Sequence, residues 1–201
     1  MLIRTLAVAA VLAITGHSAF ADSFMPTEKL PDDVKVATPF GIAIGKTTCA
    51  EAAVLLGGRG FQYPLDANLY IVMAAKPGQL YPGANLISAR CLGNLLPVGS
   101  LGVAVSESKD GPGANEAAVT LASKYMRTRL GQTEVEFKVD GGDTLVYLRS
   151  TFAAGARFSI VYETASVRDM SDRMRNRQIE EKARAAKEAA DGAAAQRSKV
   201  L

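Results

Sequence analysis

Histidine is almost absent from this chain of 201 residues, in which the single copy is His17. His17 lies in residues 1–21, which have the pattern of a segment that is removed on export. Once these residues are removed, no side chain titrates near neutral pH unaided. Nucleophile systems that depend on histidine, and zinc sites with imidazole ligands, are therefore excluded for the mature chain. Paired carboxylates or a serine–lysine pair would still permit an enzyme, but we expect a protein without catalysis.

Cysteine is limited to Cys49 and Cys91. In an oxidising compartment, two cysteines most simply form one disulfide. A redox pair would normally show C-x-x-C spacing, whereas these two cysteines lie far apart in the sequence. We therefore predict a structural bridge, which contributes roughly 4 kcal/mol for a loop of this length in the chain-entropy description.

The apolar run near the N-terminus covers only residues 6–14, which is too short to cross a bilayer as a helix of ~20 residues. Arg4 precedes this run, and the small residues of the sequence AFA follow it. The pattern predicts a secretory signal peptide over residues 1–21, with cleavage after Ala21 and a mature chain of 180 residues. No cysteine lies near the cleavage site, so a lipid anchor is not expected. We predict a periplasmic or secreted protein with no transmembrane segment in the mature chain.

Charge of one sign is not in excess over most of the chain. Residues 22–165 contain 13 Lys and Arg against 14 Asp and Glu, a net charge of −1. Residues 166–201 contain 9 basic and 6 acidic residues, a net charge of +3, so the basic pI belongs to this tail. Because residues 22–165 lack the basic stripe that marks nucleic-acid binding, we expect no nucleic-acid partner.

Turn residues and apolar periodicity divide the remaining chain into three parts. Residues 22–38 carry mixed charge and prolines and predict an irregular lead-in. Residues 39–165 predict an α+β globular domain, because strands occur in runs instead of alternating with helices. Residues 166–201 predict a charged, alanine-rich helical tail.

The first half of the domain, residues 39–110, opens with alternating apolar residues that predict a strand over 40–44. Thr48 and Glu51 then form a capping-box pattern for a helix that stops at Gly57. A glycine-rich loop follows the helix. Three further strands are predicted at residues 69–75, 85–92 and 100–108.

The second half, residues 111–165, predicts a similar order of elements. Asn115 caps a helix that extends to Gly131, and its apolar face contains Ala118, Leu121, Ala122, Tyr125 and Met126. The turn 140–143 contains two glycines that accept the positive φ of a tight hairpin. Strands are predicted at residues 132–139, 144–150 and 156–164. The sequence therefore predicts two helix-plus-three-strand antiparallel units, a pseudo-repeat without evident sequence identity, followed by a long C-terminal helix.

The tail begins with a capping-box pattern at Ser166 and Asp169. Its short apolar stripe of Val167, Met170 and Met174 is interrupted by charged residues, and sustained coiled-coil heptads are missing. Two interpretations stay open. The tail is either a solvated helix that frays after Gly192, or a helix that docks on a partner or on an anionic envelope surface.

The stretch GIAIGKTT, residues 41–48, looks like the start of a phosphate-binding loop. Such a loop needs G-x-x-x-x-G-K-[ST], but Phe40 stands where the first glycine is required. We interpret the stretch as a strand, a turn and a helix cap, with Lys46 as a solvated turn residue. The S-x-x-K match at 106–109 lacks its companion motifs, and the glycine-rich turns lack the spacing of a calcium loop. We expect no catalytic residue, no metal and no cofactor.

Aromatic residues among glycines and prolines are the best candidates for a binding site. They are Phe61 and Tyr63 in the first loop and Tyr81 in the next turn. They either fold back over the core or, if exposed, anchor a partner, since aromatic side chains supply binding area at low entropic cost.

The run FGIAIGKTTCAEAAVLLG, residues 40–57, resembles the opening of small exported bacterial proteins of the outer-membrane-assembly lipoprotein family (SmpA/OmlA, BamE-like). In that family a short glycine motif leads into a helix and a three-stranded antiparallel sheet. The order of elements is also similar to the tandem fold of secreted β-lactamase inhibitory proteins. The lipid-acceptor cysteine of the lipoprotein family is absent here, and no second glycine motif precedes Asn115. The resemblance implies a small exported α+β binding module.

These observations favour an exported, non-catalytic binding or assembly protein of the bacterial envelope that acts through contacts with another envelope protein. The alternative is a periplasmic hydrolase that uses paired carboxylates. A deep pocket holding two carboxylates with different pKa values would favour the hydrolase.

Overall fold

The computed structural model describes residues 25–63, 69–106, 112–130, 134–150 and 158–198. The predicted signal peptide over residues 1–21 lies outside these residues.

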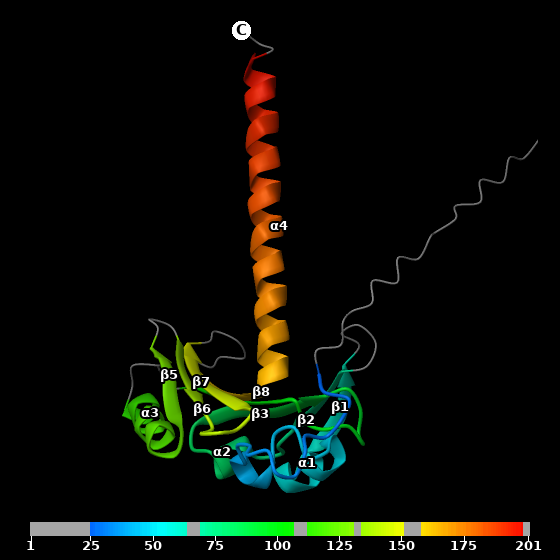
Figure 1. The fold of residues 1–201 in the computed structure, drawn as a ribbon, viewed down its shortest axis with the longest axis vertical. Helices are drawn as coiled ribbons and strands as arrows, with labels where there is room; N and C mark the ends of the chain where they lie inside the picture. Colours follow the sequence, from blue (N-terminus) through cyan, green and yellow to red (C-terminus); the bar gives the residue numbers. More distant parts are fainter. Residues whose placement is uncertain (1–24, 64–68, 107–111, 131–133, 151–157, 199–201) are drawn as a thin grey trace, which may run out of the picture.

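One antiparallel sheet, with strand order β1-β2-β3-β4-β8-β7-β6-β5, organises the described residues (Figure 1). The strands are β1 (Arg59–Tyr63), β2 (Leu69–Met73), β3 (Ala84–Cys91), β4 (Ser100–Val105), β5 (Met126–Leu130), β6 (Glu134–Lys138), β7 (Thr144–Ser150) and β8 (Phe158–Thr164). The last strands of the two halves, β4 and β8, pair at the centre of the sheet. The mixed α+β class is therefore confirmed.

The helices are η1 (Pro39–Gly41), α1 (Cys49–Leu56), α2 (Pro77–Leu80), α3 (Pro112–Lys124) and α4 (Ala165–Ser198). Helices α1, α2 and α3 cover one face of the sheet, which we call the helical face (Figure 1). Helix α4 leaves the sheet on the opposite side and extends away from it (Figure 1).

Each half contributes four strands to one continuous sheet, so the prediction of three-strand units was wrong. Strand β1 lies where the sequence predicted a glycine-rich loop. Gly58 stands before it because a Cβ at this position would collide with the carbonyl group of Met73 on the neighbouring strand β2. Strand β5 lies where a helix was predicted, and Met126, expected on the apolar face of that helix, is 54% exposed at the start of the strand.

The predicted strand over residues 40–44 is also wrong. This segment begins with the single turn η1 and continues as irregular chain. Ile42 and Ile44 are both fully buried, and the N–H of Ile44 donates to the carbonyl of Ala37. The alternating apolar pattern therefore serves burial in the core and not pairing in the sheet.

Side-chain alternation along the central strands gives the sheet two different faces. On the helical face, β4 places Leu101, Val103 and Val105 in the main core, and β8 adds Phe158 and Ile160. On the opposite face, these strands place small or polar residues such as Ser100, Gly102, Ser159 and Glu163. The large apolar core thus lies between the sheet and helices α1 and α3.

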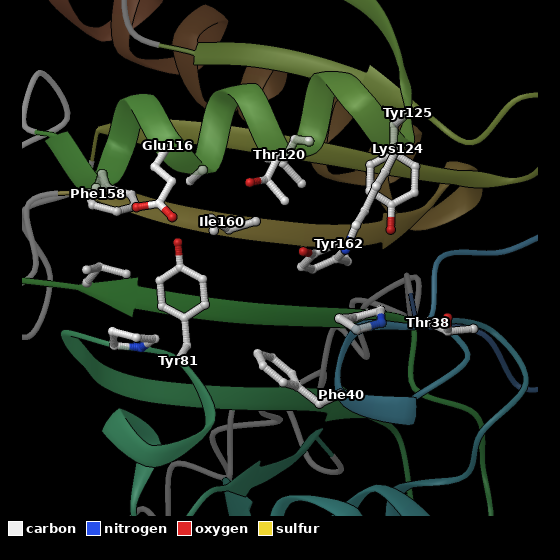
Figure 2. Close-up of a pocket in the computed structure, with 16 residues that line it drawn as sticks. Thr38, Phe40, Tyr81, Glu116, Thr120, Lys124, Tyr125, Phe158, Ile160 and Tyr162 are labelled. Atoms are coloured by element: carbon white, nitrogen blue, oxygen red, sulfur yellow. The ribbon is translucent and has the colours of Figure 1, made fainter.

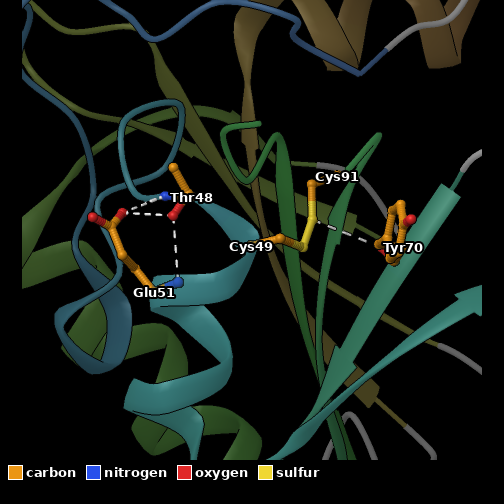
Figure 3. Close-up of a disulfide and its surroundings, with 5 residues drawn as sticks. All are labelled: Thr48, Cys49, Glu51, Tyr70 and Cys91. Atoms are coloured by element: carbon orange, nitrogen blue, oxygen red, sulfur yellow. Dashed lines mark hydrogen bonds between the residues drawn. A yellow bond between two sulfur atoms is a disulfide. The ribbon is translucent and has the colours of Figure 1, made fainter. Parts of the chain in front are cut away.

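The predicted disulfide joins Cys49, at the first position of α1, to Cys91, at the end of β3 (Figure 3). The Cα atoms of the two residues are 6.2 Å apart, and both residues are fully buried.

The predicted cap of α1 is also confirmed. The N–H of Glu51 donates to the Thr48 hydroxyl over 3.3 Å, and the N–H of Thr48 donates to the Glu51 carboxylate over 2.7 Å (Figure 3). Gly57 ends the helix with φ of 60°.

The turn 140–143 connects β6 and β7 as predicted, but its two glycines have different roles. Gly141 takes the positive φ, 63°, whereas Gly142 does not have a positive φ. A Cβ at Gly142 would collide with the carbonyl oxygen of Lys35 in the lead-in. The lead-in is irregular, as expected, but its hydrogen bonds tie it to the sheet, among them one from the N–H of Ala37 to the Thr144 hydroxyl.

Helix α4 begins at Ala165 and extends through Gly192 to Ser198, so the predicted fraying after Gly192 is wrong. Its first turn is capped by Thr164, whose hydroxyl accepts the N–H of Val167, and not by Ser166. Residues 170–172 are partly buried, and every residue of α4 from 173 to 191 is exposed. Among the described residues, no helix is both long enough and apolar enough to cross a membrane.

Candidate functional site

A groove of about 700 Å³ lies on the helical face, where the two halves of the chain meet (Figure 2). Helix α3 forms one wall, and the segments around η1 and around Tyr81 form the other. Strands β4 and β8 form the floor with Val105, Phe158, Ile160 and Tyr162. The groove therefore exists because β4 and β8 pair while the helices of the two halves stay apart above them.

Aromatic rings dominate the lining of this groove. Phe40 and Tyr81 come from the first half of the chain, and Tyr125, Phe158 and Tyr162 from the second. Burial raises the pKa of Tyr162 above its ordinary value of 10.0, and the nearby Tyr125 and Tyr81 add to this effect. Burial likewise raises the pKa of Tyr125. Both hydroxyls stay protonated at neutral pH and can donate hydrogen bonds.

Phe40 lines the groove with a backbone conformation that is unusual for an aromatic residue. Its φ is 54° and its ψ is 27°, in the left-handed region, and no other described residue except glycine has positive φ. A bulky side chain in this region is strained, at a cost of about 1–3 kcal/mol. The strain is tolerated where the ring of Phe40 packs against the core at the groove wall (Figure 2).

Three polar side chains of α3 lie along the groove: Glu116, Thr120 and Lys124 (Figure 2). Glu116 lies near Tyr81 and Phe158 at one end, and Lys124 lies near Tyr125 and Tyr162 at the other (Figure 2). Eight residues separate the two charged groups, which corresponds to roughly 12 Å along a helix. Neither group forms an ion pair with an opposite charge of the described residues.

Of the three predicted binding aromatics, the structure places Tyr81 at the groove. Tyr81 lines the groove and points toward Glu116 (Figure 2). Phe61 and Tyr63 belong to β1, the outer strand of the first half, and three strands separate their positions from β8. The side chains of Phe61 and Tyr63 lie outside the described residues, so their role as anchors stays a prediction.

The sequence did not single out the other aromatic residues of the groove as binding residues. It predicted Tyr125 on the apolar face of a helix and Phe40 in a strand. The sequence of β8 did contain a signal for the groove floor. Phe158, Ile160 and Tyr162 occupy every second position of the strand, so their side chains must lie on one face. The position of η1 opposite α3 depends on tertiary contacts, and no local pattern indicates it.

On the opposite face of the sheet, Arg168 of α4 is the centre of a charged cluster. Its guanidinium lies 4.0 Å from the ring centroid of Tyr147 and donates to Glu134 over 2.8 Å. Its Nε lies 3.1 Å from a carboxylate oxygen of Asp172, and Glu136 lies 4.0 Å from the guanidinium. Arg168 is only 5% exposed, so this cluster fixes the base of α4 to the sheet.

A second hollow, of about 560 Å³, lies beside α1 and is lined by Lys29, Lys46, Thr47, Glu51, Val54 and Leu55. The carboxylate in this lining, that of Glu51, already accepts the N–H of Thr48 in the cap of α1. Lys46 is not a freely solvated turn residue, because its ammonium donates to the carbonyl of Asp32 over 2.9 Å. Within the described residues, no group of three or more His, Cys, Asp or Glu side chains is arranged to hold a metal ion.

Comparison with known proteins gives no family for this chain. No protein-family model matches it, and neither the curated proteins nor the solved structures include a significant match.

Proposed function

We propose that this chain is an exported, non-catalytic binding or assembly protein of the bacterial envelope, which holds a segment of another envelope protein in the groove between its two halves. The observation that supports this proposal is the groove itself, with five aromatic rings and a single pair of opposite charges in its lining. Concave sites of 300–1,000 Å³ with apolar walls and a small number of polar groups are typical of binding sites. Tyrosine and other aromatic residues are also enriched where proteins bind each other.

The chemistry of the groove favours binding over catalysis. Its lining has one carboxylate, Glu116, and one amine, Lys124. A glycosidase-type mechanism needs two carboxylates on either side of the bond that breaks. Glu134 and Glu136 lie close together, but both face Arg168 on the other side of the sheet. The hydrolase alternative therefore lacks an observation in its favour.

Export to the periplasm or the medium is part of the same proposal. The disulfide between Cys49 and Cys91 is compatible with an oxidising compartment. The resemblance to the outer-membrane-assembly lipoproteins and to the tandem inhibitory proteins also belongs to the proposal. What favours this resemblance is that each half of the chain contributes helices and four consecutive antiparallel strands to the sheet.

Crosslinking in the intact envelope tests the proposal. A photo-crosslinking amino acid at Thr120, inside the groove, should capture a specific envelope protein, whereas the same group at Val119 should not. Thr120→Arg, which fills the groove with charge, should abolish capture by a crosslinker placed at Thr38 on the opposite wall. Val119 is 70% exposed and does not line the groove, so Val119→Arg is the matched control on the same helix. Equal capture from both positions, or turnover of a substrate, would contradict the proposal.

A further inference from the structure

We infer that the groove binds the C-terminal end of its partner, with the terminal carboxylate at Lys124 and a basic side chain about three residues earlier at Glu116. This inference rests on the proposed function, because it names the part of the partner that the same groove holds.

The charges of the groove are complementary to such an occupant. The lining of the groove has a negative group at one end and a positive group at the other, and neither is paired with an opposite charge among the described residues. An occupant with a cation near Glu116 and an anion near Lys124 satisfies both. Along the groove, the rings of Phe40, Tyr81 and Tyr162 favour apolar side chains.

The length of the groove fits a short chain end. Glu116 and Lys124 are eight residues apart on α3, roughly 12 Å. An extended peptide advances ~3.3 Å per residue, so this separation corresponds to about four residues. The floor agrees with this, since Phe158 and Tyr162 at the two ends of the groove are four residues apart on β8. The bound segment runs parallel to β8, from Phe158 toward Tyr162.

Hydrogen-bond donors gather at the Lys124 end of the groove. The hydroxyls of Tyr125 and Tyr162 lie at this end together with the ammonium of Lys124 (Figure 2). All three groups donate hydrogen bonds at neutral pH, and a carboxylate accepts several. Their arrangement favours an anion over an amide at this position.

The groove favours a chain end over an internal segment. Strands β4 and β8 pair with each other along the floor, so they offer no free sheet edge to a bound backbone. A segment that crosses an apolar groove without such pairing leaves buried N–H and C=O groups unsatisfied, each at a cost of about 1–3 kcal/mol. A chain end buries fewer of these groups, and its carboxylate accepts hydrogen bonds from the donors at the Lys124 end.

Tryptophan-labelled peptides test this inference, because the protein contains no tryptophan and the fluorescence then comes from the peptide alone. The probe is acetyl-Lys-Leu-Trp-Phe with a free C-terminal carboxylate. The comparison peptides are the same sequence with a C-terminal amide, acetyl-Lys-Leu-Trp-Asp-amide, and acetyl-Ala-Leu-Trp-Phe with a free carboxylate. We expect the probe to bind about fivefold more tightly than each comparison peptide, as for a partly exposed charge pair.

Charge variants identify the residues involved. Lys124→Glu should remove the preference for the free carboxylate, and Lys124→Arg should retain it. Glu116→Gln should remove the preference for lysine over alanine. Lys138→Glu, on the opposite face of the sheet, is the control and should change neither preference. Circular dichroism verifies that each variant is folded, and Lys124→Gln replaces Lys124→Glu if the latter is not.

The outcomes separate the inference from the proposed function. The C-terminal assignment is overturned if acetyl-Lys-Leu-Trp-Phe-amide binds as tightly as the free acid. It is also overturned if acetyl-Lys-Leu-Trp-Asp-amide does so. If none of the peptides binds, the inference is also overturned. In either case the proposed function still stands when Thr120→Arg blocks crosslinking to an envelope protein, and it fails when Thr120→Arg has no effect.

Discussion

Phe40 combines backbone strain with a position in the groove, and these two properties can be separated by mutation. Replacing Phe40 with alanine removes the ring but keeps a side chain at φ of 54°. Replacing it with glycine removes both the ring and the strain. We expect Phe40→Gly to be more stable than Phe40→Ala by about 1 kcal/mol, the reverse of the usual order of these two residues. Urea denaturation of both variants measures this difference.

The same pair of variants tests whether the ring contributes to binding. Both should bind the partner segment more weakly than the parent, because both lack the ring. At an ordinary surface position such as Val119, the alanine variant should instead be more stable than the glycine variant, since glycine costs about 1 kcal/mol inside a helix. If alanine is also the more stable residue at position 40, the backbone there is not strained.

Glu163 is a buried carboxyl group on the face opposite the groove. It is 8% exposed, and the Ser100 hydroxyl donates to it over 3.2 Å. Burial raises the pKa of Glu163 above 4.5, against the opposing effects of Arg149, the Ser100 hydrogen bond and Arg168. The folded state therefore holds this proton more tightly than the unfolded chain does. Its contribution to stability falls as pH rises from 4.5 through the raised pKa.

Glu163→Gln should remove this pH dependence. The variant keeps a polar group of the same size beside Ser100 and has no charge to bury. We expect its melting temperature to exceed that of the parent at pH 7, and the two to converge at pH 4. Melting curves across this pH range measure the effect. A variant that is less stable than the parent at pH 7 would show that the arginines outweigh the cost of burial.

At the scale of elements, the cap of α1 is the best-defined local structure. Thr48→Ala removes the hydroxyl that accepts the N–H of Glu51, and should lower the free energy of unfolding by about 1 kcal/mol. Thr48→Ser keeps the hydroxyl and should lose little. Hydrogen bonds from the Thr48 N–H and then from its hydroxyl lower the pKa of Glu51, so this part of the cap's effect is present above pH 4.5 and is lost as pH falls below it. Urea denaturation at pH 7 and pH 3 tests both points, and equal losses for Ala and Ser would contradict the assignment.

The elements that the sequence predicted correctly are those with strong local signals. The capping box at Thr48 and Glu51, the stop at Gly57 and the turn 140–143 each satisfy backbone groups within a few residues. The six strands other than β1 and β5 have apolar alternation or runs that burial on one face requires. The disulfide was predictable because only two cysteines are available.

Strands β1 and β5 could not be predicted from their own residues. Both are outer strands of the sheet, so they pair with one neighbour only. The sequence of β1, RGFQY, contains a glycine and follows two others, and that of β5, MRTRL, has basic residues at alternate positions. Their pairing with β2 and β6 is decided by the neighbouring strand, and β propensity depends on such context. The groove was missed for a related reason, since Phe40, Tyr81 and Tyr162 come together only after β4 pairs with β8.

At the scale of the whole molecule, the two faces of the sheet carry different structural features. The helical face holds the large core and the groove, and both halves of the chain contribute to each. The opposite face carries the charged cluster around Arg168, which fixes the base of α4. A segment bound in the groove and a surface met by the far end of α4 would therefore lie on opposite sides of the protein.

The last prediction concerns how much of α4 the fold needs. Val167 is fully buried and packs with Met25, and Arg168 is 5% exposed. From residue 173 to residue 191 every side chain is exposed, so this part of the helix makes no contribution to the core. Deleting residues 176–201 should leave the domain folded, with a melting temperature within about 5 °C of the parent. A truncated protein that fails to fold would show that the exposed helix is needed by the core.

Arg168→Ala is the contrasting variant, because it changes one residue at the base and leaves the exposed helix intact. Loss of the Arg168 side chain removes the partner of Glu134 and uncovers the ring of Tyr147, and should cost about 3 kcal/mol of folding free energy, as for a broken buried ion pair.

If the exposed part of α4 binds an anionic envelope surface, deleting residues 176–201 should weaken that association without lowering peptide binding in the groove. Added salt should weaken it too, since charges more than ~8 Å apart are screened at physiological ionic strength. Co-sedimentation with anionic vesicles, at low and high salt, separates this role of α4 from a merely solvated helix.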